Sequence, residues 1–329
     1  MIGEYSGAGY ANNAGELGTG TMDALLDFDF NDFAQNFVTG NISSVENSLQ
    51  KRNKRSTTPL SWEAFLSSHD EDTLQYTLVN KSKLSEEEAY NLMKVAATLQ
   101  ITAKGQPVLY YGEEIGQGGA NNWPLQTNRR DFDWTELEKQ KADSNSIYNH
   151  YKTMLAIRNT YTDVFARGSR NVVASSDEEG YDVIARSYGD TTLYVGMNIN
   201  DTAKEVKVPV NANAGDTVKN LYDGKTYTVS SDKTVTVSIP AAKDGGTVIL
   251  TEVKKTVDPT PADPGKKDPT PTPVKKDGVI SVTDKAAIET KKAAPKSGDD
   301  NEAATYVCLL GLAMVAITAA TYRKKRACK

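Results

Sequence analysis

The sequence predicts an α/β region followed by an all-β region, and two observations indicate this fold class. Up to residue 162, strand-like and helix-like segments alternate, which is the pattern of βα units. After that point the helical periodicity stops, and short runs rich in Val, Thr and Tyr alternate with turn residues. The remaining tail is rich in Pro, Thr and Lys. We therefore expect four parts: residues 1–162, 163–253, 254–293 and 294–329.

The α/β part is predicted from periodicity and capping signals. Ser85 opens a capping box with Glu88, and the apolar residues that follow recur every three or four positions. This pattern predicts a helix with one buried face. Glu4 and Asp70 follow strand-like segments, and in βα barrels the functional groups lie at the carboxyl ends of the strands. The other expected strands are residues 23–30, 60–67 and 108–111, and the other expected helices are residues 31–38, 43–54 (capped by Ser43) and 144–159.

The all-β part contains seven short runs with strand character. Dipeptides such as Asp223-Gly224 and Gly245-Gly246 separate them and favour tight turns. About 90 residues of this kind predict an antiparallel β-sandwich. The expected strands are residues 181–188, 192–198, 205–209, 217–221, 226–229, 234–239 and 247–251.

Composition excludes several classes of protein. The 329 residues carry a net charge of −5, but residues 1–253 are near −11 and the tail is near +6. An acidic body argues against nucleic acid as the main partner, because phosphate binding needs a basic face. The only histidines are His69 and His150, and both cysteines lie in the last 22 residues. This argues against a Cys/His zinc site, a disulfide framework and a thiol nucleophile.

The tail has the features of a surface stalk and an anchor. Residues 259–273 hold six of the twelve prolines, which favours an extended, disordered segment without a core. Residues 304–322 contain no charge, and as a helix they would span about 28 Å, close to the thickness of a membrane. Arg323 to Arg326 follow at once, and positive charge marks the cytoplasmic side. We expect one transmembrane helix, with the body outside the cell.

The motif Ala294-Pro295-Lys296-Ser297-Gly298 precedes this apolar segment. The order of small motif, apolar span and basic end resembles the cell-wall sorting signal of Gram-positive surface proteins. The resemblance implies cleavage between Ser297 and Gly298 and makes sortase and peptidoglycan the expected partners. A plain single-pass membrane anchor is the alternative. No secretion signal opens the chain, so we expect that an N-terminal portion is missing.

Several motifs of the body resemble the α-amylase family of glycoside hydrolases (family 13 type). Phe65-Leu66-Ser67-Ser68-His69-Asp70 is similar to the motif on the family's strand 7, and the segment from Gln106 to Glu114 is similar to strand 8. Ile2-Gly3-Glu4 is similar to the strand-5 motif. The resemblance implies the C-terminal half, strands 5–8, of a (β/α)8 TIM barrel, followed by the family's β-sandwich. The implied substrate is an α-glucan of the starch type.

The resemblance also assigns roles to residues. It makes Glu4 the general acid/base and Asp70 the carboxylate that stabilises the transition state, with His69 binding the sugar beside it. Retaining glycosidases need such paired carboxyls. Trp123, in a loop rich in Gly and Asn, is a further candidate for stacking on a sugar. No cofactor is required, and although calcium is compatible with the resemblance, no residue pattern of this chain supports it.

One family feature has no counterpart in the sequence. The family nucleophile is an Asp in a Gly-x-Arg-x-Asp motif upstream of the acid, and no such motif occurs in this chain. We therefore expect a truncated hydrolase that is inactive alone. Two alternatives remain open: an α-1,6 debranching enzyme of the same family, since no Arg closely follows His69-Asp70, and a surface glucan-binding protein without catalysis.

Overall fold

Four short parallel strands form the first sheet of the computed structural model, which describes residues 2–4, 23–55 and 62–253. The strands lie in the order β1-β2-β3-β4, and each pairs with its neighbour in sequence. Helices connect β2 to β3 and β3 to β4 within the described residues, and sequential parallel strands with helical crossovers are the arrangement of a barrel segment, which confirms the predicted βα units. The bounds are β1 (Ile2–Gly3), β2 (Ala24–Asp27), β3 (Trp62–Ala64) and β4 (Gln106–Pro107).

Several helices of this part begin at a residue whose side chain caps the first turn. Ser85 and Glu88 form the predicted capping box, and the Ser146 side chain accepts a hydrogen bond from the backbone N–H of Asn149. The principal helices are α2 (Asp29–Val38), α3 (Ile42–Arg55), α5 (Glu86–Ile101), α6 (Trp134–Ala142), α7 (Ile147–Thr160) and α8 (Thr162–Arg167). Shorter turns are α4 (Leu74–Tyr76), η2 (Thr77–Lys81), η3 (Glu113–Ile115) and η4 (Thr127–Arg129).

Two local predictions are wrong. Ser43 does not cap α3, because the helix begins one residue earlier and Ser43 instead donates to the carboxylate of Asp177. Residues 108–111 do not form a strand. The N–H of Val108 still pairs with the carbonyl of Ala64, but the carbonyl of Val108 is taken by the side chain of Gln100. The chain then turns at Gly112, whose φ of 85° suits glycine.

The second part is the predicted antiparallel β-sandwich. One sheet has six strands in the order β10-β9-β12-β7-β6-β5, and the other pairs β11 with β8. The seven predicted strands are all present, with ends shifted by two residues at most, and β5 is an additional strand that the sequence pattern did not indicate. The bounds are β5 (Ser169–Ser176), β6 (Tyr181–Tyr188), β7 (Thr191–Asn198), β8 (Lys204–Pro209), β9 (Thr217–Asn220), β10 (Thr226–Thr228), β11 (Thr234–Ile239) and β12 (Thr247–Val253), with the turn η5 (Ala242–Asp244) before β12.

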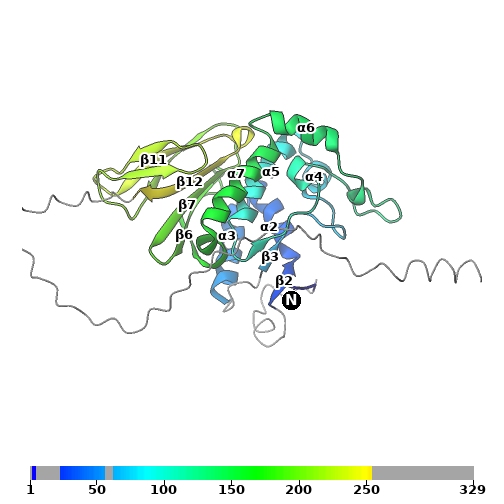
Figure 1. The fold of residues 1–329 in the computed structure, drawn as a ribbon, viewed down its shortest axis with the longest axis horizontal. Coiled ribbons are helices and arrows are strands. Elements are labelled where there is room, and N and C mark those ends of the chain that lie inside the picture. Colours follow the sequence, from blue (N-terminus) through cyan, green and yellow to red (C-terminus); the bar gives the residue numbers. More distant parts are fainter. Residues whose placement is uncertain (1, 5–22, 56–61, 254–329) are drawn as a thin grey trace, which may run out of the picture. The chain divides into compact units, whose positions relative to one another are not determined.

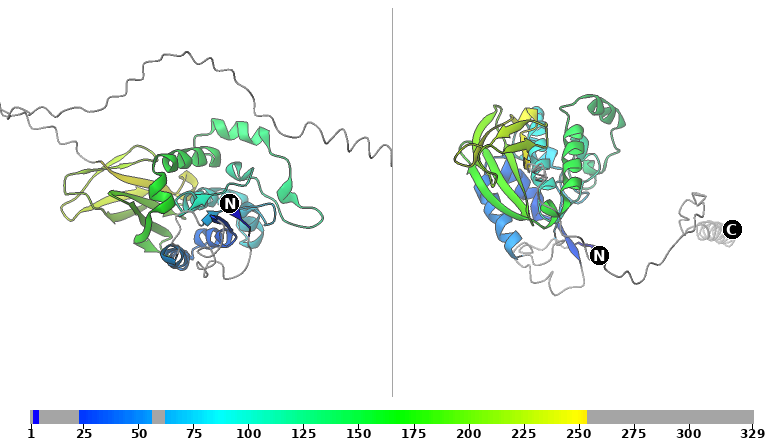
Figure 2. Two further views of the ribbon diagram at one scale, coloured as in Figure 1. Left: turned by 60° about the horizontal axis from the view of Figure 1, so that its bottom comes forward. Right: turned by 60° about the vertical axis from the view of Figure 1, so that its left-hand side comes forward.

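The six-stranded sheet is apolar on both faces, because it packs against a different layer on each side. Val183, Val248 and Leu250 face the two-stranded sheet. Their strand neighbours Ile184 and Ile249 pack into the same core as the helices. Figures 1 and 2 show the helices α5 and α7 beside the yellow-green strands of the sandwich. The helices are thus covered by the parallel sheet on one side and by the sandwich on the other.

The predicted tail is outside the structural description. Residues 254–329 contain the expected stalk, the motif with Ser297 and Gly298, and the apolar segment 304–322. Within the ranges that the structure does describe, no helix is both long enough and apolar enough to cross a bilayer.

Candidate active site

Glu4, His69 and Asp70 line one cavity of about 130 Å³. Glu4 directly follows β1, and the other two lie in the turn after β3, so the cavity opens at the carboxyl ends of the parallel strands. The two motifs thus lie at the same cavity although 65 residues separate them in the sequence. The walls are mostly apolar and include Leu26, Phe28, Phe65, Val108 and Leu109.

Asp70 has a cationic or polar partner on each carboxylate oxygen. His69 Nε2 lies 3.1 Å from Oδ2, and Arg129 Nη2 donates to Oδ1 at 2.9 Å. The side chain of Asp70 is 45% exposed, so solvent or a ligand can reach it. Each carboxylate oxygen offers two lone pairs, and one on each remains available for the hydroxyl of a bound molecule.

Two buried acids lie near this turn without lining the cavity. Glu113 accepts a hydrogen bond from the Tyr151 hydroxyl at 2.8 Å, and burial raises its pKa to about 8, although bonds from Tyr151 and Ser67 oppose the shift. Burial also raises the pKa of Glu63 to about 7, against the charge of Arg158. Both carboxyls therefore favour the protonated form at neutral pH to a degree that exposed acids do not.

Trp123 does not join this group of residues. The residue is 84% exposed, and it is not among the residues around the cavity of Glu4 and Asp70. Its loop does contact the turn, because the side-chain amide of Asn121 donates to the carbonyl of Asp70 at 2.6 Å. A stacking role for Trp123 therefore stays a prediction.

Arg129 and Asn128 were missed by the sequence reasoning. Both lie in the turn η4 and contact residues 68–71, about 60 positions earlier in the chain. Their contacts follow no helical or strand period, so periodicity cannot reveal them. The available signal was their position in the long loop after β4, since loops after barrel strands carry functional groups.

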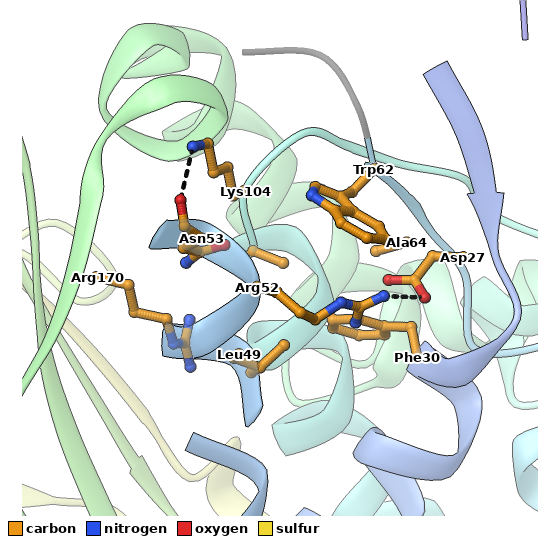
Figure 3. A pocket seen from close by; sticks show the side chains of 10 residues that line it. Asp27, Phe30, Leu49, Arg52, Asn53, Trp62, Ala64, Lys104 and Arg170 are labelled. Carbon is orange, nitrogen blue, oxygen red and sulfur yellow. Dashed lines mark hydrogen bonds and ion pairs between the residues drawn. The ribbon is translucent and has the colours of Figure 1, made fainter. Parts of the chain in front are cut away.

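A second cavity lies among β2, β3 and α3 and is shown in Figure 3. Arg52 forms an ion pair with Asp27 there, and its guanidinium lies 4.3 Å from the centre of the Trp62 ring. The volume of about 10 Å³ is room for roughly one water molecule. A sugar ring cannot enter, so this cavity is not a candidate for the active site.

The described residues show no group of three or more His, Cys, Asp or Glu side chains that could hold a metal ion. The calcium considered from the sequence therefore gains no support from side-chain clusters in these parts of the chain. The polar side chains that line the cavity supply the carboxyls of Glu4 and Asp70, the imidazole of His69, and hydroxyls from Ser67, Ser68 and Tyr110.

Comparison with known proteins identifies a related family. The family described as "Alpha amylase, catalytic domain" matches residues 1–133. A cyclomaltodextrinase of Geobacillus thermopakistaniensis is 29% identical over 188 residues, which are 51% of this chain and 30% of the relative. An amylopullulanase of Thermoanaerobacter thermohydrosulfuricus is 32% identical over 164 residues, which are 47% of this chain and 10% of the relative.

Solved structures show the same fold. An Anoxybacillus alpha-amylase superposes with a TM-score of 0.62 at 21% identity, covering 78% of this chain and 52% of its own. The alpha-amylase of Geobacillus thermoleovorans gives a TM-score of 0.61 at 19% identity, covering 78% and 53%. The chain thus spans about half the length of these structures and less than a third of the length of the two curated relatives. In sequence and fold the chain is therefore similar to glycoside hydrolases of the alpha-amylase family, whose catalytic domain is matched by residues 1–133.

Proposed function

We propose that the chain contributes the acid/base half of a retaining hydrolase site for α-glucans of the starch type. The observation that carries the proposal is that Glu4 and Asp70 line one cavity at the carboxyl ends of β1 and β3, the two strands on either side of β2. A solvent-accessible pair of carboxyls beside apolar walls suits a sugar, whose ring presents C–H groups on its faces and hydroxyls at its edge. The family match over residues 1–133 supports the same reading.

In this proposal each residue has a separate task. Glu4 gives its proton to the glycosidic oxygen as the bond breaks and later takes a proton from the attacking water. Asp70 accepts hydrogen bonds from ring hydroxyls, and these bonds strengthen as positive charge develops on the sugar. His69, 3.1 Å from Asp70, supplies a donor beside it.

The same mechanism requires a carboxylate nucleophile about 5–5.5 Å from the acid. The sequence contains no Gly-x-Arg-x-Asp motif to supply it. We therefore propose that this chain by itself binds glucan without turning it over, as expected of a truncated hydrolase.

The first experiment compares binding of maltoheptaose by the wild-type chain and by the Asp70→Asn and Glu4→Gln variants, using calorimetry. The Asp70→Asn change should weaken binding about tenfold, because a charged acceptor is lost. Asp163→Asn is the matched control, since Asp163 is an exposed acid on α8, outside the cavity. If the wild-type chain does not bind maltoheptaose, the proposed function is wrong. Turnover that depends on Glu4 would refute both our expectation of an inactive chain and the purely glucan-binding alternative.

A debranching function on α-1,6 bonds is the second candidate. Several relatives carry names of this kind, including amylopullulanases of two Thermoanaerobacterium species and a probable oligo-1,6-glucosidase of Bacillus subtilis. Binding of maltotriose against panose, which differ in one linkage, distinguishes the two specificities. Preference for panose would favour the debranching candidate.

We also propose that the protein is displayed on the outside of a Gram-positive cell wall. The support is the order of the Ala294-to-Gly298 motif, the uncharged residues 304–322 and the basic residues that follow. In a host with a sortase, the wild-type chain preceded by a secretion signal should be released only by wall-digesting enzymes, and its Gly298→Pro variant should stay in the membrane fraction. Equal recovery of both variants in the membrane fraction would favour a single-pass anchor instead.

A further inference from the structure

The Asp70 turn, residues 67–72, is not held by its own backbone. Among the described residues, no hydrogen bond between two backbone groups closes this turn. Instead, the carbonyls of four consecutive residues accept hydrogen bonds from side chains of the loop after β4. The carbonyls are those of Ser68, His69, Asp70 and Glu71, and the donors are Asn121, Asn128 and Arg129.

Asn128 makes the central contribution. Its Nδ2 group lies 3.2, 2.9 and 2.9 Å from the carbonyl oxygens of Ser68, His69 and Glu71. The side chain is buried, with only 3% of the residue exposed. The chemistry fixes the orientation of the amide, because the flipped group would place its oxygen against three carbonyl oxygens.

Asn128 is itself held firmly. Its backbone N–H donates to the carbonyl of Ala120 at 3.1 Å, and its carbonyl accepts from the Tyr110 hydroxyl at 3.1 Å. Tyr110 also lines the cavity that contains Glu4 and Asp70. The donor is therefore fixed to the wall of the same cavity that it shapes.

Arg129 contacts both the backbone of the turn and the carboxylate of Asp70. Its Nε donates to the carbonyl of His69 at 3.0 Å, and its Nη2 donates to Oδ1 of Asp70 at 2.9 Å. One planar guanidinium thus joins the backbone of the turn to the side chain that the turn presents. A lysine cannot reproduce both bonds with this geometry.

We propose that Asn128 and Arg129 are positioning residues of the glucan site: Asn128 sets the path of residues 68–71, and Arg129 sets the rotamer of the Asp70 carboxylate. This inference rests on the proposed function, because glucan is the ligand that Asp70 would be positioned to meet. It assigns the placement of the Asp70 turn to two residues of the loop after β4.

Chemical rescue tests the role of Arg129. The Arg129→Ala variant should bind maltoheptaose about tenfold more weakly than the wild type, since two bonds of a charged donor are lost. Guanidinium ion at a non-denaturing concentration should restore much of the binding, because the Arg129 side chain is 41% exposed and its site is open to solvent. Arg129→Lys should recover little. Arg167→Ala is the control, since Arg167 is similarly exposed but pairs with Asp163 on α8.

Hydrogen exchange tests the role of Asn128 without any ligand. The backbone amides of Thr73 and Leu74 donate to Gly119 and Ser67 and report whether the loop and the turn stay together. Asn128→Asp replaces the donor by an acceptor that repels three carbonyls, so both amides should exchange at least tenfold faster, while amides in β6 keep their wild-type rates. Asn128→Ala should give a smaller effect in the same direction.

The outcomes separate the two proposals. If the wild-type chain does not bind maltoheptaose, the proposed function fails, and exchange at Thr73 and Leu74 still decides whether Asn128 positions the turn. Wild-type exchange in Asn128→Asp, or unchanged glucan binding in Arg129→Ala, would overturn the positioning roles. Equal recovery of binding by guanidinium in Asp70→Asn would also overturn the role of Arg129, because the rescue must act through the Asp70 carboxylate.

Discussion

In two regions of the molecule, side-chain donors bind backbone carbonyls, but one region is buried and the other is partly exposed to solvent. At the junction, where α3, α5, α7 and α8 pack on the six-stranded sheet, Arg186 donates to the carbonyls of Thr102, Val164, Phe165, Gly168 and Ser169. At the Asp70 turn, Asn128 and Arg129 donate to the carbonyls of residues 68, 69 and 71. In both regions, side-chain donors hold the backbone of another segment by hydrogen bonds to its carbonyls.

The difference is burial. Arg186 is fully buried, and burial lowers its pKa. At the turn Asn128 is buried too, but it is neutral, and the charged or titratable side chains of His69, Asp70 and Arg129 are 41–59% exposed. A buried cation is destabilising unless its hydrogen bonds are complete, so losing them costs much more inside the protein than at its surface. We infer that the junction supplies stability, while the turn supplies a defined but accessible shape. The following predictions concern the free energy of unfolding and test this division.

The largest decrease in the free energy of unfolding is expected for a substitution at the junction. Arg186→Met removes a buried charged donor that bonds five backbone carbonyls and should lower the free energy of unfolding by about 3–5 kcal/mol. Urea denaturation measures this change. Arg129→Met is the matched variant at the turn and should lower it by no more than about 1 kcal/mol. Equal losses for the two variants would contradict the comparison.

The next effect concerns Glu113, which links the two regions through Tyr151 on α7 and Ser67 in the turn. Burial raises its pKa from 4.5 to about 8. Between these values the folded protein keeps a proton that the unfolded chain loses, so stability falls as pH rises, by up to about 1.4 kcal/mol per pH unit. Above pH 8 both states are ionised and this loss stops growing.

Glu113→Gln removes this titration. Its unfolding free energy should therefore fall less than that of the wild type between pH 5 and pH 8, as measured by urea denaturation across the range. Glu114→Gln, at the neighbouring and more exposed position, is the control and should keep the wild-type pH dependence. Parallel pH curves for Glu113→Gln and the wild type would show that the buried carboxyl does not act as described.

The sequence predicted the parts of both regions that local chemistry determines. The Ser85–Glu88 capping box needs only residues three positions apart, and the strands of the sandwich show as runs of Val, Thr and Tyr. Strand β5 was missed because its buried Arg170 looks like a surface residue until Glu46, 124 positions away, pairs with it. Asn128 was missed for the same reason. Such pairs depend on the folded arrangement and leave no periodic signal.

A smaller effect is expected at the start of α5, the helix that contributes to the core beside both regions. Ser85→Ala removes one half of the capping box, so the free energy of unfolding should fall by about 1 kcal/mol. Thermal unfolding followed by circular dichroism is sufficient to detect it. Ser48→Ala, within α3, is the control and should be neutral or slightly stabilising, because alanine favours helix interiors. An equal loss in both variants would remove the argument for the cap.

The smallest effect on stability is expected at Asp70, where the proposed effect on glucan binding is large. Its partners His69 and Arg129 are exposed, and exposed ion pairs contribute little, so Asp70→Asn should change the free energy of unfolding by less than about 0.5 kcal/mol. Urea denaturation and maltoheptaose binding, measured on the same preparation, give the two values together. A loss of several kcal/mol would show that the turn is a structural element like the junction. Unchanged stability together with weakened maltoheptaose binding would show that the contacts of Asp70 determine the shape of the site and contribute little to stability.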